Sequence, residues 1–278
     1  MKHYLEDIVK KLAVPGFRNA NNNSWNDAME MVHSLIIETG FKPDIQEWEN
    51  TEKNKIYRNF SVKINGKNKR KIIVGAHYDT FENTPGADDN ASAVAVLLGI
   101  LKSIDKNLIP EFTIECVFYA CEEQPFFDTE NMGSFIHASN CSINEVECMI
   151  CLEMVGYFSN EKNTQDYPFS ILKWIFGSRG NFLIGVSNFS SASKSTIIMN
   201  KLKRIRPDFY KKLILPFFFS GMDWSDHRSY WNKKIPALML TDTAMFRNKN
   251  YHTDKDIFTT LNYEVMANLV ADLTFILK

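Results

Sequence analysis

Histidine and carboxylate side chains stand where apolar runs of this sequence end. His77 and Asp79 follow the apolar run 72–76, and Asp89 lies in the acidic loop Gly-Ala-Asp-Asp-Asn-Ala-Ser at 86–92. Histidine and carboxylates are ligands that zinc accepts. Because a strand end and a helix start hold side chains rigidly, this arrangement suits a metal site. A metal centre around His77 and Asp89 is therefore the first expectation.

Two further apolar runs carry acids of the same kind. Glu122 and Glu123 directly follow the run 112–120, and Glu153 lies inside the run 147–157. A carboxylate in such surroundings loses its hydration and is seldom buried without a partner. In open α/β sheets, ligands bind beyond the carboxyl ends of the strands. Three predicted strands therefore bring metal-type side chains to one edge of a sheet.

A pair of metal ions is the chemistry that fits the whole set. A carboxylate such as Asp89 can bridge two cations about 3.5–4 Å apart, and water held between them loses a proton readily. Glu122 can take that proton and pass it to a leaving amine. Asp79, on the same side of the strand as His77, can hold the imidazole by its second nitrogen. The five predicted ligands are His77, Asp89, Glu123, Glu153 and His252.

Each signal alone has an ordinary structural explanation. A histidine at a strand end is often a hydrogen-bonded core residue, and Asp88, Asp89 and Asn90 can cap a helix. Glu122 and Glu123 can be a surface pair. The coincidence of four such sites in one chain favours the metal interpretation over these alternatives.

The pattern of apolar residues predicts alternating strands and helices. An α/β fold follows, with a mixed, mostly parallel central sheet and helices on both faces. No change in composition marks a second domain, so residues 1–278 are expected to form a single one. Asn65 and Gly66 predict a hairpin turn, and 157–180 is expected to be loop. The predicted strands are 41–48, 56–64, 71–77, 112–120, 147–157, 181–186 and 235–240, and the predicted helices are 1–12, 28–39, 91–104, 133–139, 190–206 and 262–277.

The composition limits the classes of partner. The chain has 278 residues and a net charge of -1, which predicts neither nucleic acid nor an anionic membrane as a partner. Its five cysteines are odd in number, and Cys148 and Cys151 lie in a predicted strand, so reduced, buried thiols are expected. No signal-peptide pattern and no run of about 20 apolar residues is visible. A cytoplasmic location is expected, secretion of a processed form stays open, and the oligomeric state is not predicted.

The motifs together resemble those of the zinc-dependent exopeptidases, a family that includes the bacterial leucyl aminopeptidases and the catalytic domain of glutamate carboxypeptidase. The resemblance runs from about Arg18 to the C-terminus and keeps the family's order. The motif Gly-Ala-His-Tyr-Asp at 75–79 and the acidic loop at 85–92 carry it most specifically. The other matching motifs are Glu122-Glu123, Leu152-Glu153-Met154, Ser225-Asp226-His227 and Tyr251-His252-Thr253.

The resemblance implies a zinc aminopeptidase/phosphorylase-like fold and a peptidase that removes residues from the free N-termini of peptides. It implies two zinc ions bridged by a hydroxide, with Glu122 as the general base. Other divalent transition metals, such as cobalt or manganese, can occupy the same ligands. The implied ligand groups are His77, Asp89 and Glu153 on one zinc, and Asp89, Glu123 and His252 on the other.

Residues that would bind substrate are less sharply defined. Asp226 and His227 match a family loop beside the pocket, and they are expected either to lie near the metals and substrate or to be structural. Tyr251 precedes a predicted ligand and is expected to line the site or to pack beside it. The candidates for an apolar side-chain pocket are Met222, Trp224 and Tyr230.

Two other functions remain open. Glutaminyl cyclases share this fold and bind one zinc, but they typically lack this form of the acidic loop and carry tryptophan before the last histidine, where Tyr251 stands here. A non-catalytic binding domain would have lost a ligand or Glu122, and none is missing. A di-zinc aminopeptidase is therefore the favoured prediction, ahead of a mono-zinc cyclase and a binding domain.

Overall fold

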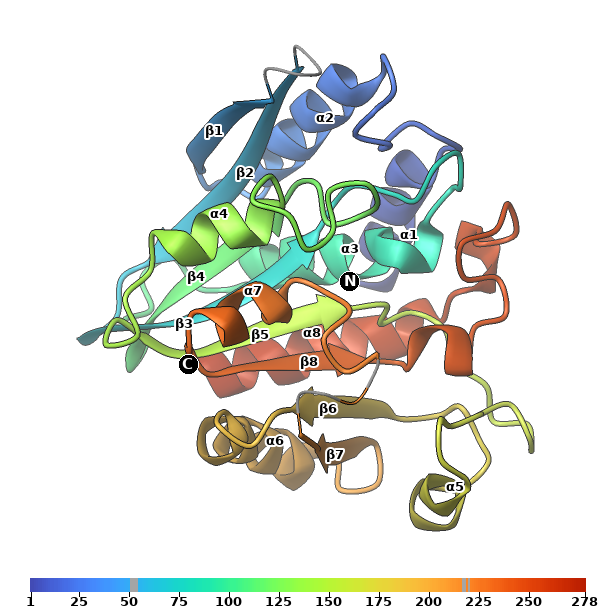
Figure 1. Ribbon diagram of the computed structural model, residues 1–278. Coiled ribbons are helices and arrows are strands. Elements are labelled where there is room, and N and C mark those ends of the chain that lie inside the picture. The colour runs from blue at the N-terminus through green and yellow to red at the C-terminus, as the bar shows by residue number, and fades with distance from the viewer. Residues whose placement is uncertain (51–54, 217–218, 220) are drawn as a thin grey trace.

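A computed structural model describes residues 1–50, 55–216, 219 and 221–278. Its centre is an eight-stranded sheet with the order β1-β2-β4-β3-β5-β8-β6-β7 (Figure 1). Strands β4, β3, β5 and β8 run parallel, whereas β1, β2 and β6 pair in antiparallel fashion with their inner neighbours. The strands are β1 (Asp44–Asn50), β2 (Lys55–Ile64), β3 (Asn68–His77), β4 (Phe112–Tyr119), β5 (Val146–Glu153), β6 (Leu183–Ser187), β7 (Tyr210–Ile214) and β8 (Ala237–Thr241).

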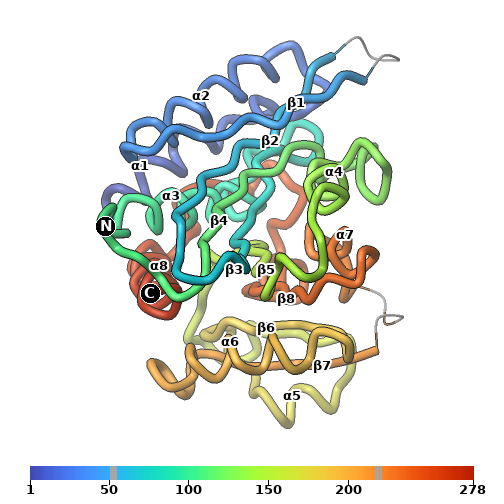
Figure 2. The backbone as a smooth tube through the Cα atoms, turned by 90° about the vertical axis from the view of Figure 1, so that its left-hand side faces the viewer, coloured from blue at the N-terminus to red at the C-terminus, as the bar shows by residue number. Residues whose placement is uncertain are grey.

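Helices cover both faces of this sheet. Helices α1, α3, α6 and α8 pack together on one face, and α4 packs with α7 on the other (Figures 1 and 2). The predicted α/β fold with a mixed, mostly parallel sheet is thereby confirmed. The helices are α1 (Lys2–Leu12), α2 (Trp25–Glu38), α3 (Ala93–Ser103), α4 (Gly133–Ser139), α5 (Ser170–Phe176), α6 (Ala192–Ile205), α7 (His227–Asn232) and α8 (Tyr263–Leu277).

Strand β3 lies in the middle of the sheet and is buried on both faces. Ile72 and Val74 face the larger core under α3 and α8, whereas Ile73 faces the second core under α7. Such a run of apolar residues is typical of a parallel strand covered from both sides. The strand ends at His77, so the core fixes the position of this imidazole.

The predicted hairpin at Asn65 and Gly66 is wrong. Strand β4 lies between β2 and β3, pairing antiparallel with β2 and parallel with β3. Gly66 is needed for a close approach instead, because an added Cβ would lie 2.4 Å from the carbonyl carbon of Phe112. The glycine therefore allows the chain to pass the start of β4 rather than to turn back on itself.

Three short elements differ from the sequence prediction. The region 157–180, expected to be loop, contains α5, and neither β7 nor α7 was predicted. The five cysteines are free, as expected, and all but Cys141 are buried. None of the helices within the described ranges is long and apolar enough to cross a membrane.

Candidate metal centre

The ends of parallel neighbouring strands place the first acidic and histidine side chains. His77 is the last residue of β3, Glu153 is the last residue of β5, and Glu122 and Glu123 follow β4. Since these strands run in the same direction, their carboxyl ends meet at one edge of the sheet (Figure 1). The sheet thus brings together four of the side chains that the sequence singled out.

The acidic loop 87–92 is held by hydrogen bonds from several directions. The carboxylate of Asp256 accepts the backbone N–H groups of Asp88 and Asp89, at 2.9 and 3.1 Å. Across the loop, the side-chain oxygen of Asn90 accepts the N–H of Met154 at 3.0 Å. The loop is therefore fixed to the chain that follows β5, and Asp89 lies beside His77, where β3 ends.

Arg18 supports the same loop from the N-terminal part of the chain. Its guanidinium is fully buried and donates to the carbonyl oxygens of Tyr78 and Pro85, at 2.9 and 3.2 Å. Burial lowers the pKa of Arg18 to about 10, against the opposing attraction of Asp89 and Asp79. The side chain stays charged at neutral pH and places a fixed positive charge beside the carboxylates.

Two groups of three side chains converge, and both include Asp89. In the first group, Nε2 of His77 lies 3.4 Å from oxygens of Asp89 and Glu153. In the second, Nε2 of His252 lies 3.2 Å from Asp89 and 3.5 Å from Glu123. Bonds of about 2.0–2.1 Å to a tetrahedral zinc put neighbouring ligand atoms roughly 3.3 Å apart. Most of these distances are longer than an N–H···O hydrogen bond and match the edges of a metal coordination shell.

Unpartnered polar atoms show that the site fits a cation. Within the described ranges, Oε1 of Glu123 and Nε2 of His252 are buried and have no hydrogen-bond partner. A buried polar atom without a partner is costly, and a metal ion would supply one to both. Burial by itself would raise the pKa of Asp89, but His252 and His77 on either side lower it below its usual range.

Asp79 organises the turn that follows β4. It is fully buried, and its two oxygens accept the backbone N–H groups of Glu122 and Glu123, at 3.0 and 2.9 Å. One of these oxygens also lies 3.5 Å from Nδ1 of His77. Asp79 was expected to hold the imidazole of His77, and its contacts are those of a positioning residue that orients three neighbours at once.

Glu122 lies beside His77 of the first ligand group and directly precedes Glu123 of the second. Its carboxylate lies 3.9 Å from Nε2 of His77 and is almost fully buried. Burial raises the pKa of Glu122 well above its usual value; attraction by His77 opposes this shift and repulsion by Glu123 adds to it. A carboxylate with a raised pKa can hold a proton near neutral pH, as a general base requires.

His252 is held by aromatic stacking. Its ring lies between Phe81, with ring centres 4.0 Å apart, and Tyr251, with ring centres 3.8 Å apart. Burial would lower the pKa of His252, but Asp89 and Glu123 raise it to about 10. Sequence reasoning missed Phe81, because an aromatic residue two positions after Asp79 carries no recognisable signal.

The loop before α7 contributes Ser225, which the sequence analysis named only as part of a motif and without a role. The hydroxyl of Ser225 donates to Oε2 of Glu153 at 2.6 Å. Next to it, Asp226 is fully buried, and burial raises its pKa to about 7. His227 points elsewhere: its Nε2 donates to the carbonyl of Met222 at 2.7 Å, and burial lowers its pKa to about 4. These contacts give His227 a structural environment away from both ligand groups.

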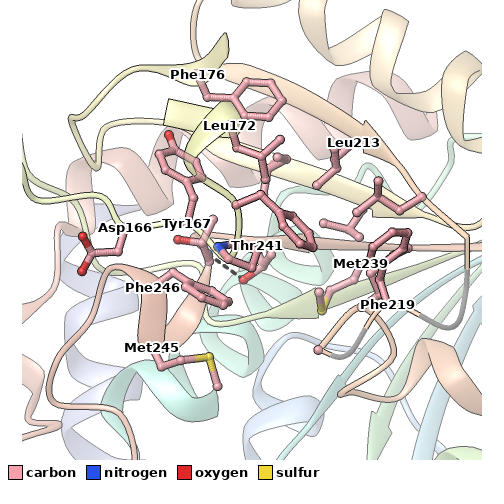
Figure 3. A pocket seen from close by; sticks show the side chains of 18 of the residues that line it. Asp166, Tyr167, Leu172, Phe176, Leu213, Phe219, Met239, Thr241, Met245 and Phe246 are labelled. Carbon is pink, nitrogen blue, oxygen red and sulfur yellow. Dashed lines mark hydrogen bonds between the residues drawn. The ribbon is translucent and has the colours of Figure 1, made fainter. Parts of the chain in front are cut away.

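An apolar pocket (Figure 3) has a volume of about 340 Å³, and two of its lining residues are neighbours of proposed metal ligands. Tyr251 lines it next to His252, and Thr241 lines it beside its strand partner Glu153. Met222 and Trp224 also line the pocket, as predicted. Other lining side chains are Leu172, Phe176, Leu213, Phe219, Met239 and Phe246.

Tyr230 does not line this pocket, contrary to the prediction. Its hydroxyl lies 2.6 Å from that of Tyr119 and 2.7 Å from Nδ1 of His137, in a fully buried polar network. Such a network satisfies a buried tyrosine without any role toward a ligand.

Residues 59–274 match the peptidase family M28. The chain is 35% identical over 262 residues to the uncharacterized protein YfbL of Escherichia coli, a match that covers 91% of this chain and 80% of YfbL. It is 25% identical over 253 residues to a probable leucine aminopeptidase of Arthroderma otae. That match covers 86% of this chain but only 60% of the length of the fungal protein.

Solved structures share the fold at low sequence identity. The LapA aminopeptidase of Legionella pneumophila superposes with a TM-score of 0.70 at 17% identity, covering 99% of this chain and 70% of LapA. The glutaminyl cyclase of Tannerella forsythia gives a TM-score of 0.68 at 18% identity, covering all of this chain and 98% of the cyclase. These likenesses show the fold and do not separate the two activities. The family match, which spans most of the chain, does show the family: the chain belongs to peptidase family M28, the zinc-dependent exopeptidases.

Proposed function

We propose that this protein is an aminopeptidase that works with two zinc ions. The observation that supports it best is the pair of ligand groups that share Asp89. The ligand atoms of each group lie within 4.8 Å of one another. A shared carboxylate between two such groups is the arrangement used by two-metal hydrolases.

The residues around the metals would each have a different role in hydrolysis. When bound, the two zinc ions supply a polarised substrate carbonyl and a water of lowered pKa. Glu122 takes a proton and delivers it to the nitrogen of the departing peptide, because its buried carboxylate lies beside His77. The carboxylate of Asp79 holds Glu122 and His77 in their relative positions, because it accepts the backbone N–H of Glu122 and lies beside the ring of His77.

The substrate would be a peptide with a free N-terminus. The carboxylates of the centre attract an ammonium group, and the adjoining apolar pocket accepts the first side chain. Its walls of Met222, Met239 and Phe246 favour an apolar or aromatic side chain over a charged one. Tyr251 stands between the pocket and His252, so it would contact the first residue.

Metal content and activity should be measured together. Elemental analysis and hydrolysis of aminoacyl-anilides would be compared for the wild type, Glu122→Gln and the exposed control Glu130→Gln. We expect two zinc ions per chain in all three, and a loss of about 10²–10⁴-fold in kcat for Glu122→Gln alone.

The same samples separate the competing functions. One zinc per chain, with cyclisation of peptides that begin with Gln and no anilide hydrolysis, would identify a glutaminyl cyclase. Tight metal binding with neither reaction would point to a binding domain, and the absence of tightly bound metal would contradict both enzymes.

A further inference from the structure

Helix α5 presents an apolar face to solvent. Ile171, Trp174 and Ile175 are 61%, 88% and 61% exposed, and their spacing puts them on one side of the helix. We call these three residues the α5 face. The opposite side of α5 carries Leu172 and Phe176, which line the apolar pocket (Figure 3). In a helix that is apolar on both sides, both sides are normally buried against other groups. The exposed α5 face is therefore a candidate binding surface.

The segment 157–220, which contains α5, is basic, and most of its cations lie farther along it, at 194–212. Residues 157–220 contain ten Lys and Arg against three Asp and Glu, although the whole chain has a net charge of -1. Elements α5, α6, β6 and β7, which belong to this segment, lie together at the lower end of the molecule in both views (Figures 1 and 2). The net charge of the whole chain, which predicts no attraction to a membrane, does not show that this segment is basic and the rest of the chain acidic.

Three exposed cations lie in α5 or near it in the chain: Lys162, Lys173 and Arg179. Among the residues that the structure describes, none of the three forms an ion pair. Lys173 and Arg179 donate to neutral oxygens of neighbouring asparagines. Of the two acids in 157–180, Asp166 is paired with Lys249, at 2.7 Å, and Glu161 is exposed beside Lys162. The cations beside α5 are therefore available to anions outside the protein.

We propose that the α5 face binds the surface of an anionic phospholipid bilayer. Exposed tryptophan and isoleucine side chains enter the headgroup region, and the three cations meet lipid phosphates. A second copy of the chain fits less well, because a symmetric dimer through α5 would bring two basic segments together. This contact goes beyond the proposed peptidase activity and does not depend on it.

Binding in this way would also place the pocket at the membrane. Leu172 and Phe176 form a wall of the pocket, and Trp174 and Ile175 lie on the outer side of the same short helix. The pocket would then lie near the bilayer surface.

Vesicle sedimentation of the full chain tests the proposal. One set of vesicles contains phosphatidylglycerol and phosphatidylcholine in equal amounts, and the other contains phosphatidylcholine alone. We expect binding to the anionic vesicles only, weakened by salt. Trp174→Gln should bind roughly tenfold more weakly. Replacing Lys162, Lys173 and Arg179 by Gln should weaken binding about fivefold for each charge removed. The control Phe275→Gln changes an apolar residue on α8 that is 69% exposed, and it should bind like the wild type.

Each alternative result overturns the proposal. Absence of binding to anionic vesicles contradicts it directly. Equal binding to both vesicle types, unchanged by removing the cations, would show an unspecific apolar contact. Self-association that is lost in Trp174→Gln, without vesicle binding, would identify the α5 face as a dimer surface. Circular dichroism of every variant verifies folding, and anilide hydrolysis is measured separately, so failure of the peptidase proposal remains distinguishable.

Discussion

The two proposed ligand groups are built in different ways. His77 and Glu153 end neighbouring strands of the sheet and are almost fully buried. Glu123 and His252 lie in loops, and the side chain of His252 is 26% exposed. The sheet therefore fixes the positions of the ligands in the first group. In the second group, contacts made by the loops fix the positions of the ligands.

The means of holding each histidine differ accordingly. His77 lies against the buried carboxylate of Asp79, the usual outer partner of a metal-binding imidazole. His252 is instead confined between the rings of Phe81 and Tyr251. Stacking limits the tilt of a ring but fixes its rotation less firmly than a hydrogen bond does. We therefore expect the first group to bind its metal more tightly than the second.

Asp89→Asn should have the largest effect, because it removes the one residue common to both groups. We expect kcat/KM to fall by at least about 10³-fold, since the metals supply several kcal/mol of transition-state stabilisation. Both metals should be lost on dialysis, as measured by elemental analysis. The exposed control Asp254→Asn should keep both. Retention of two metals at unchanged affinity would show that the groups do not share this ligand.

Asp79→Asn should have an intermediate effect on both groups. The amide leaves one oxygen to accept the two backbone N–H groups of Glu122 and Glu123, and it removes the charge beside His77. A loss of 10–100-fold in metal affinity or activity is expected, in the range of other outer-shell changes. A variant that loses only thermal stability, with normal metal affinity and kcat, would limit Asp79 to a folding role.

Phe81→Ala should separate the two groups. Removing the ring frees one side of His252, so the affinity of the weaker metal should fall roughly tenfold while that of the tighter metal stays constant. Metal titration with activity as a parallel measurement follows both sites. Phe81→Tyr keeps an aromatic face and should restore the affinity. An equal loss at both sites would contradict the assignment of stacking to the second group alone.

Glu115→Gln should leave activity unchanged and lower stability. Burial would raise the pKa of this carboxylate, but His137 and Lys71 lower it from 4.5 to about 2. Because the folded-state pKa is the lower one, the stabilisation is complete above about pH 5 and disappears as the pH falls toward 2.

At neutral pH the Glu115→Gln variant should lose about 3 kcal/mol in the free energy of unfolding. Urea unfolding at pH 7 and pH 3 measures this difference, which should shrink at the lower pH. The exposed neighbour Glu111→Gln serves as the control. A difference that is the same at both pH values would mean that packing, not charge, accounts for the change.

The strand ends of the fold could be predicted because their signal is local. His77, Glu123 and Glu153 each close or follow a dense apolar run, and parallel strands must gather such ends at one edge. The order of the strands could not be predicted in the same way. Asn65 and Gly66 favour a hairpin locally, but β3 needs a neighbour on each side, and β4 occupies the place next to it.

The supporting residues of the site were mostly invisible in the sequence. Asp256 and Arg18 contact the acidic loop across about 170 and 70 positions, so no spacing rule connects them with it. Ser225 was noticed only as part of a motif, and its bond to Glu153 depends on where the loop before α7 lies. The proposed metal ligands can thus be predicted from the sequence. The residues that orient these ligands can be identified only in the folded structure.

The contacts of Arg18 determine which part of the chain must be transferred together when a chimera is made. The match to the peptidase family begins at residue 59, so Arg18 lies outside it. A fragment that starts there would carry every proposed ligand but not the guanidinium that fixes Tyr78 and Pro85. The family match alone therefore marks a smaller piece than the one that holds the acidic loop in place, and a chimera joined at residue 59 would need the preceding segment from the same parent.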